Sequence, residues 1–143
     1  MERYVYGRRE KLSVFTQAEI DYLVSQRLGR LATVGVDGHP HVVPVGFRYN
    51  DELDTIDIGG HEFAKRKKFR DVRRNPWVAL VVDDLASVRP WVVRGIEIRG
   101  EADVLKTGGA EIGPGYDEAM FRIRPSRVVT WGLEGAAARS DHA

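Results

Sequence analysis

Cysteine is absent from the 143 residues, so the chain can form no disulfide, thiolate metal site or cysteine nucleophile. Histidine is scarce, and none of the four histidines is spaced as a metal-binding pair requires. No apolar run is long enough to span a bilayer, and the first residues contain no apolar signal-peptide core. These absences lead us to expect a cytoplasmic protein that holds no metal and does not enter a membrane.

Motifs typical of hydrolases and nucleotide-binding enzymes are also missing, namely Gly-x-Ser-x-Gly, Walker A and a Gly-x-Gly-x-x-Gly that follows a strand. His39 and His41 flank Pro40 at a turn, and we expect neither to be catalytic. The acids Asp83-Asp84 follow an apolar run, and we interpret them as a loop cap. No catalytic side chain is identified, so an enzyme of this sequence would need a cofactor for its chemistry.

Turn and capping signals divide the chain into short elements. Thr16 to Glu19 forms a capping box that begins a helix, and Asp37-Gly38 is a strong hairpin signal. Pro44 lies inside the next strand, which predicts an edge position or a bulge. We predict strands over 30–36, 41–49, 54–58, 77–82, 91–105 (as one strand or two) and 127–133, and helices over 16–26, 64–74 and 116–121.

The fold class follows from the order of these elements. Short connections between consecutive strands favour a closed antiparallel barrel over a parallel sheet. We therefore predict a mostly β protein, a barrel of six or seven antiparallel strands with a few short helices. Loops are expected over 83–90 and 106–114, Trp77 is expected in the core, and Gly95 and Gly100 are expected at bends or bulges. A single domain spans 1–143, and we expect its tail, 134–143, to be disordered.

Positive charge is concentrated in one segment. The chain has a net charge of +1, but Lys65 to Arg74 alone carries +6, which leaves −5 for the rest. Four cations, Lys65-Arg66-Lys67-Lys68, stand at the predicted helix start, where they oppose the helix dipole. A bound anion would explain this placement, and Gly59-Gly60 just before it would let a ligand approach the backbone. A solvated helix face and a weak nucleic-acid patch remain alternatives, although stacking aromatics are lacking.

Four stretches taken together resemble the split β-barrel family of pyridoxamine 5'-phosphate oxidase-like flavin and deazaflavin oxidoreductases. These stretches are 31–45, 64–82, 95–102 and 123–132, and the segment Arg74-Asn-Pro-Trp-Val78 is most similar to the branch that depends on coenzyme F420. The resemblance implies a split β-barrel homodimer that holds its cofactor at the interface between the two subunits.

The resemblance also implies which residues hold the cofactor. Lys67 and Lys68 match the basic pair that binds its phosphate. Arg66 stands where the family commonly has Ser or Thr, and with Arg70 it is expected to meet the acidic tail of coenzyme F420. The cofactor ring is expected to contact the backbone of two strand segments. One aromatic residue is expected near the cofactor ring of the partner subunit. These ring-contacting positions are Val45, Gly46, Ile58, Gly59, Gly60 and Trp131.

Two departures from the family pattern bear on the choice of cofactor. The flavin oxidases carry an Arg and a Lys where this chain has His41 and Gly46, so two phosphate-binding cations are missing. These differences disfavour vitamin B6 oxidase activity and favour coenzyme F420 over FMN. The expected function is hydride transfer between coenzyme F420 and an unsaturated small-molecule substrate, whose pocket is expected to be built from the loops over 85–94 and 106–116. The alternatives are an FMN-binding oxidase-like protein or flavin carrier, and a non-enzymatic module that binds phosphorylated ligands or nucleic acid.

Overall fold

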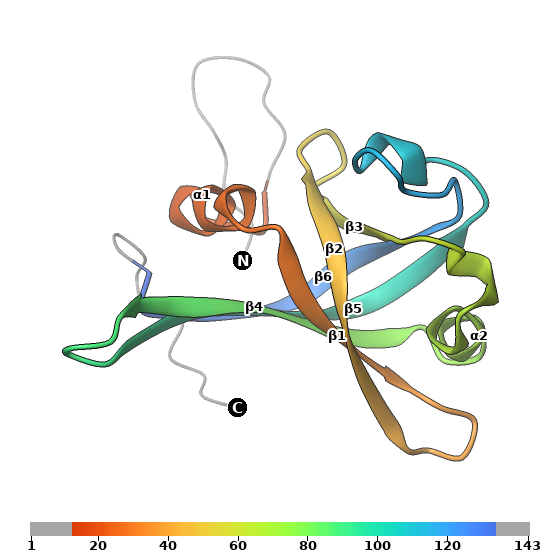
Figure 1. The fold of residues 1–143 in the computed structure, drawn as a ribbon, viewed down its shortest axis with the longest axis horizontal. Helices are drawn as coiled ribbons and strands as arrows, with labels where there is room; N and C mark the ends of the chain where they lie inside the picture. The colour runs from red at the N-terminus through yellow and green to blue at the C-terminus, as the bar shows by residue number, and fades with distance from the viewer. Residues whose placement is uncertain (1–12, 134–143) are drawn as a thin grey trace.

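The protein is described by a computed structural model over residues 13–133, which form a closed barrel of antiparallel strands with two α-helices (Figure 1). Its elements are α1 (Gln17–Ser25), β1 (Leu28–Val34), β2 (Pro40–Asn50), β3 (Thr55–Gly59), a 3₁₀ helix η1 (Phe63–Lys65), α2 (Lys67–Arg74), β4 (Trp77–Ser87), β5 (Val92–Leu105), a 3₁₀ helix η2 (Gly109–Glu111) and β6 (Met120–Trp131). The strand order around the barrel is β1-β2-β3-β6-β5-β4. The predicted antiparallel split β-barrel is confirmed, with six strands in the described residues.

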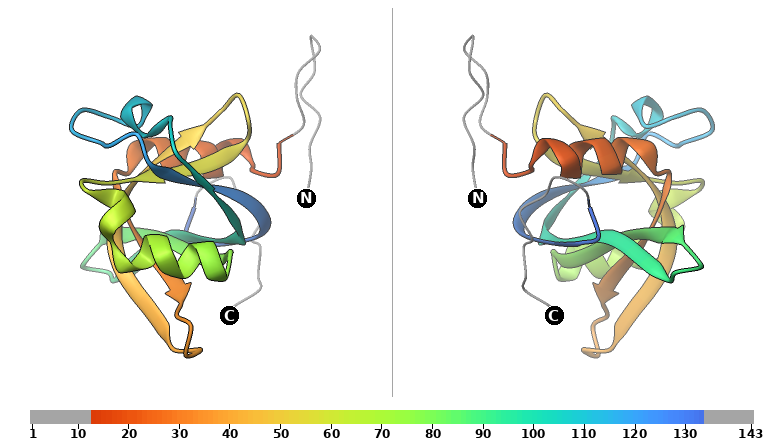
Figure 2. Two further views of the ribbon diagram at one scale, coloured as in Figure 1. Left: turned by 90° about the vertical axis from the view of Figure 1, so that its right-hand side faces the viewer. Right: turned by 90° about the vertical axis from the view of Figure 1, so that its left-hand side faces the viewer.

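The start of α1 follows the predicted capping box. The Glu19 N–H donates to Thr16 Oγ1 at 3.1 Å, and the Thr16 N–H donates to Glu19 Oε1 at 2.7 Å. These reciprocal bonds satisfy backbone donors that the first helical turn leaves without partners. Figure 2 shows α1 and α2 on opposite sides of the barrel. Neither helix within residues 13–133 is long and apolar enough to cross a membrane.

The barrel interior is filled by alternate residues of each strand. In β4, Val78, Leu80 and Val82 face inward and are buried. Trp77 precedes them by one position, so it faces outward and is 54% exposed. The prediction that Trp77 lies in the core is wrong, because this apolar run buries only one face in the barrel. In α2, Phe69 and Val72 face the core as predicted.

The β1–β2 hairpin turns at Asp37-Gly38, and Gly38 has the left-handed φ of +81° that such a turn requires. β2 pairs with β1 from Pro40 to Gly46, but it pairs with β3 only from Gly46 to Asn50. Among the described residues, the first half of β2 therefore has one unpaired side. Pro44 lies in that half, which confirms its predicted edge position, because a proline has no N–H to offer a second neighbour.

The predicted polar loop over 83–90 is wrong, because β4 continues to Ser87 and only residues 88–91 form the turn. Ion pairs make the two acids compatible with a strand. Asp83 pairs with Arg30 at 2.7 Å, and Asp84 accepts hydrogen bonds from Arg94 at 2.7 Å and from Tyr22 Oη at 2.8 Å. The Asp83-Asp84 pair is therefore a set of cross-strand partners rather than a loop cap.

The predicted helix over 116–121 is also wrong. Residues 113–119 form an irregular loop, η2 lies within the predicted loop over 106–114, and β6 begins at Met120 rather than 127. A backbone hydrogen bond from the Asp117 N–H to the Gly60 carbonyl, 2.9 Å, ties this loop to the end of β3. Residues 92–105 form one strand, and its register with β6 shifts at Gly100, as predicted for a bulge.

Candidate functional site

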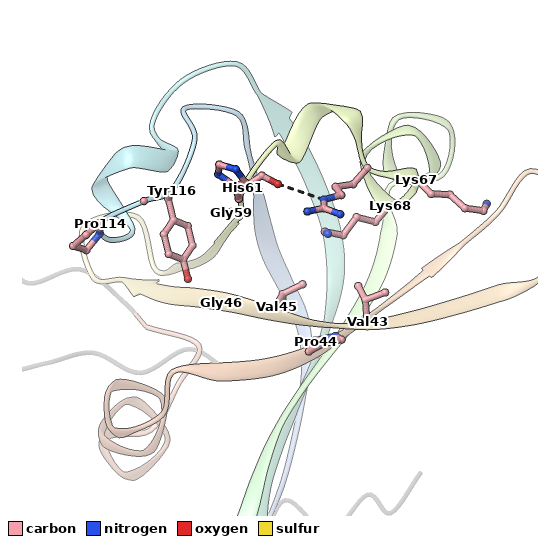
Figure 3. A pocket seen from close by; sticks show the side chains of 13 residues that line it. Val43, Pro44, Val45, Gly46, Gly59, His61, Lys67, Lys68, Pro114 and Tyr116 are labelled. Carbon is pink, nitrogen blue, oxygen red and sulfur yellow. Dashed lines mark hydrogen bonds between the residues drawn. The ribbon is translucent and has the colours of Figure 1, made fainter.

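A cleft of about 570 Å³ lies where β2, the end of β3, the start of α2 and the 113–116 loop meet (Figure 3). This volume is in the range of small-molecule sites. One end of the cleft is cationic, the floor is apolar, and the other end is closed by an aromatic residue. It is lined by Val43, Pro44, Val45, Gly46, Gly59, Gly60, His61, Arg66, Lys67, Lys68, Pro114, Gly115 and Tyr116.

The floor of the cleft is the half of β2 that lacks a neighbour on one side. β2 runs from Val43 at the cationic end to Gly46 at the aromatic end, and Val45 is buried. The pairing of Gly46 with Gly59 marks the point where β3 joins β2. The open side of the floor therefore arises because β3 is shorter than β2.

The basic segment does not form one continuous helix. The predicted helix over 64–74 begins later, because η1 occupies Phe63–Lys65 and α2 starts at Lys67. Arg66 between them is extended, with φ −78° and ψ 150°, and serves as the N-cap of α2. No side chain caps this end of α2. Because of this break, Lys65 lies in η1 and Lys67 and Lys68 lie in α2, so the four cations do not lie on one helix.

Two cations of the segment meet at the cleft. Lys68 is partly buried, and its Nζ lies 5.0 Å from the centre of the Phe63 ring. Arg66 Nε donates to the His61 carbonyl at 3.3 Å, the dashed line in Figure 3. Burial lowers the pKa of Lys68 below its usual value, and the positive charge of Arg66 lowers it further. An anion held between these two side chains would relieve that repulsion.

The expected pair Lys67 and Lys68 points in two directions. Lys67 extends away from Lys68 (Figure 3), and its Nζ lies 3.3 Å from the buried carboxylate of Asp71. A second hollow of about 240 Å³ begins at Lys67 and continues past Arg70 and Arg74. Lys67 therefore stands between the cleft and this hollow, whereas Arg66 and Lys68 face the cleft floor.

The expected ring-contacting residues are only partly brought together. Val45, Gly46, Gly59 and Gly60 line the cleft, whereas Ile58 is fully buried in the barrel. Trp131 does not line this cleft. It packs on Gly95, where a Cβ would lie 2.7 Å from Trp131 Cζ2. The family expectation places Trp131 against the partner subunit's cofactor, a site that one chain does not contain.

Tyr116 ends the segment 106–116 that is expected to contribute to the substrate pocket, but the sequence predicts no role for its side chain. Its ring lies over the paired glycines of β2 and β3, and its hydroxyl points toward Gly46 (Figure 3). A Cβ on Gly59 would lie 2.8 Å from Tyr116 Cδ2, and a Cβ on Gly46 would overlap Tyr116 Oη. Predicting a helix over 116–121 hid this position. The turn at Gly113-Pro114-Gly115 is visible in the sequence, but no local signal shows that the next side chain lies over Gly46 and Gly59.

This arrangement defines a split β-barrel protein with a cleft that has an apolar floor, cations at one end and an aromatic side chain at the other. A family model described as pyridoxamine 5'-phosphate oxidase matches residues 15–137. The chain belongs to the pyridoxamine 5'-phosphate oxidase family.

Individual relatives agree with this assignment. The chain is 50% identical over 129 residues to a protein of Streptomyces rimosus named 5a,11a-dehydrotetracycline/5a,11a-dehydrooxytetracycline reductase, covering 90% of this chain and 91% of that protein. A conserved hypothetical protein from Mycobacterium tuberculosis has a similar structure, with 25% identity, a TM-score of 0.66 and 89% of each chain covered. A FAD-binding protein from Mycobacterium smegmatis shares the fold at 22% identity, with a TM-score of 0.59 over 82% of this chain and 94% of that one.

Proposed function

We propose that the protein is an oxidoreductase that transfers a hydride between coenzyme F420, bound in the cleft, and an unsaturated organic substrate. The observation that carries this proposal is that two cations, Arg66 and the partly buried Lys68, lie together at one end of an apolar cleft floor. A reductase that is 50% identical over most of both chains supports the redox activity.

The residues of the cleft fit such a cofactor. Arg66 and Lys68 supply two donors and two positive charges for a phosphate, and α2 begins beside them with no capping side chain. Val43 and Val45 offer apolar contact along the floor. Arg70 lines the adjoining hollow with Lys67, where further negative charge on the tail of coenzyme F420 would be accepted.

The choice of coenzyme F420 over FMN is supported by the two missing cations. Gly46 lines the cleft but has no side chain, and Tyr116 fills the space beside it. His41 lies in the hairpin, where a Cβ on Gly35 would lie 3.1 Å from His41 Nε2, and it does not line the cleft. Neither position offers a cation for a second phosphate contact.

The chain's contribution to catalysis is binding, orientation and exclusion of water. When bound, a reduced deazaflavin supplies a hydride. Lys68 and Arg66 would hold the anionic end of the cofactor, and Val45 would help to exclude water from the floor. A carbon–carbon double bond accepts a hydride when a conjugated carbonyl withdraws its electrons. The name of the Streptomyces relative supports a polycyclic substrate of this kind.

We assign the functional unit to a homodimer in which the partner covers the open side of the cleft. Trp77 of β4 and Val42 of β2 lie on the two strands that flank β1, and their side chains are 54% and 66% exposed. Exposed apolar side chains of this size are typical of an interface. Sedimentation of the purified protein should give a dimer. Trp77→Glu should shift it toward monomer and weaken cofactor binding, and a wild-type monomer would contradict the assignment.

Fluorescence titration with coenzyme F420 and with FMN tests the function. We expect tighter binding of coenzyme F420, and Arg66→Ala/Lys68→Ala should weaken it by about 10²-fold or more, because each charged hydrogen bond contributes roughly 1.5–3 kcal/mol. The control Lys65→Ala/Arg73→Ala removes the same charge from exposed positions outside the cleft and should change affinity little.

Three results would favour the alternatives. A yellow preparation that releases FMN on denaturation would contradict the choice of coenzyme F420. Binding of coenzyme F420 without reduction of dehydrotetracycline or another polycyclic enone would favour a carrier. DNA binding with a steep salt dependence and no cofactor binding would favour a nucleic-acid module.

A further inference from the structure

Tyr116 is held over the end of the cleft by glycine on two neighbouring strands. Gly46 and Gly59 are register partners in β2 and β3, and neither could carry a Cβ without meeting the tyrosine ring. The ring therefore occupies a slot formed by two missing side chains. This slot lies at the end of the cleft opposite Arg66 and Lys68 (Figure 3).

The loop that carries Tyr116 is attached to the cleft wall through the next residue, Asp117. The Asp117 N–H donates to the Gly60 carbonyl at 2.9 Å, and Asp117 Oδ2 accepts from the Phe63 N–H at 3.2 Å. The Tyr116 N–H itself donates to the Gly113 carbonyl at 3.3 Å. These contacts fix the backbone of Tyr116, and the glycine slot holds its ring, as a group that acts on a ligand requires.

The hydroxyl of Tyr116 differs from those of the other tyrosines within residues 13–133. Tyr22 Oη donates to Asp84 at 2.8 Å, and Tyr49 Oη donates to Asp54 at 2.6 Å. Tyr116 Oη has no hydrogen-bond partner in the described part of the chain, and it points onto the floor beside Val45. A fixed donor above an apolar floor is available to an oxygen atom of a ligand.

We infer that Tyr116 is a catalytic residue whose hydroxyl donates a hydrogen bond to the carbonyl oxygen of an α,β-unsaturated substrate. This inference rests on the proposed function, with the reduced deazaflavin as the two-electron reductant. The hydride joins the carbon β to the carbonyl, the π electrons of the double bond shift toward the carbonyl, and the oxygen gains the negative charge. Tyr116 stabilises that charge. The α carbon then takes a proton from water, so that one hydride and one proton are added across the double bond.

The geometry also distinguishes Tyr116 from the other polar side chains of the cleft. Arg66, Lys67 and Lys68 belong to the cationic end of the cleft, and His61 is exposed at its rim. Tyr116 is the polar side chain that lies over the floor at the aromatic end of the cleft. A substrate that stacks there presents its carbonyl to a phenol rather than to a cation.

The test compares Tyr116→Phe, which keeps the ring in its slot, with wild type. Removal of one donor to a developing oxyanion should lower kcat for reduction of a polycyclic enone by roughly 10²-fold. The dissociation constant of coenzyme F420, measured by fluorescence, should stay within about twofold. Binding of the saturated ketone product, measured by tryptophan quenching, should weaken about three- to tenfold. The control Tyr49→Phe removes a phenol hydroxyl outside the cleft and should leave all three quantities unchanged.

The outcomes separate this inference from the proposed function. A wild-type protein that neither binds coenzyme F420 nor reduces the enone overturns the proposed function and the inference with it. An active wild type whose Tyr116→Phe variant keeps its kcat and its ketone affinity overturns the inference alone. Equal weakening of coenzyme F420 and ketone would make Tyr116 a structural residue and would also overturn it.

Discussion

At the scale of single residues, the cationic end of the cleft is determined by where each side chain points. Lys67 and Lys68 are neighbours in sequence, but Lys67 is bound to Asp71 and Lys68 faces the cleft with Arg66. A sequence pattern identifies the basic pair, but it does not separate a cation that is already paired from one that repels its neighbour.

Lys68→Ala should therefore weaken binding of coenzyme F420 more than Lys67→Ala does. We expect a loss of about tenfold or more for Lys68, because a charged hydrogen bond contributes roughly 1.5–3 kcal/mol, and about threefold or less for Lys67. Fluorescence titration at one fixed salt concentration measures both. Equal losses for the two variants would show that the direction seen for Lys67 is not kept when the ligand binds.

Gly46 provides a test of the slot that holds Tyr116. Gly46→Ala should lower the free energy of unfolding by about 1–3 kcal/mol, because its Cβ would overlap Tyr116 Oη. In a Tyr116→Ala background the same change should be neutral or stabilising, since alanine suits a strand better than glycine. Urea denaturation of the four proteins in this cycle gives the coupling, and additive effects would rule out the contact.

At the scale of elements, the break between η1 and α2 places the cations. Arg66 has the extended backbone of an N-cap but no side chain that can accept the N–H groups of α2. Ser and Thr are strongly preferred at such positions, so arginine there costs helix stability. This cost is consistent with a site maintained for a ligand rather than for folding.

Arg66→Ser should accordingly raise the free energy of unfolding by about 1 kcal/mol, because the serine hydroxyl can accept from the helix N–H groups. Arg66→Ala removes the same charge without supplying a cap, and it serves as the matched control. Thermal melts of the two variants without ligand would detect the difference. Identical melting temperatures would mean that the cap position is not formed in solution.

The sequence predicts elements well where a local signal specifies the backbone. The capping box at Thr16, the turn at Gly38 and the edge position of Pro44 are all confirmed, because each depends on a few adjacent residues. The loop that carries Tyr116 was predicted as a helix, since its conformation depends on a hydrogen bond to Gly60, far away in sequence. The cationic end and the glycines of the cleft could thus be predicted, but the tyrosine side chain that covers Gly46 and Gly59 could not.

At the scale of the whole molecule, the barrel closes where β3 meets β6, two strands that are far apart in the chain. Asp57 of β3 is 1% exposed at this junction and accepts hydrogen bonds from Arg122 of β6 at 2.9 and 3.2 Å. Asn50 of β2 also donates to Asp57, at 3.0 Å. One buried carboxylate therefore connects three strands.

This carboxylate should make stability depend on pH. Burial raises the pKa of Asp57, but hydrogen bonds from Arg122 and Asn50 outweigh it and hold the pKa below its usual value. The stabilisation is therefore complete above about pH 4, the unfolded-state pKa, and is lost as the pH falls through the folded-state pKa. Asp57→Asn should cost about 3–5 kcal/mol at pH 7 and flatten this acid dependence.

Urea denaturation from pH 7 to 2 measures this effect. Asp103→Asn removes a carboxylate from an exposed pair with Arg124 and should change the free energy of unfolding little. An acid dependence that is the same in wild type and Asp57→Asn would show that other groups govern it.

The unpaired side of the first half of β2 has a consequence for how the protein behaves in a crowded solution. An unpaired strand side is a template on which a second chain can add a strand, the first step of aggregation. Pro44 pairs with Arg30 of β1, and Pro40 pairs with Val34, without contributing an N–H to the sheet. A neighbouring strand would require donors along this half of β2, and neither proline has an N–H to offer. Two prolines thus leave the floor of the cleft accessible to a small molecule while making it a poor partner for another β-strand.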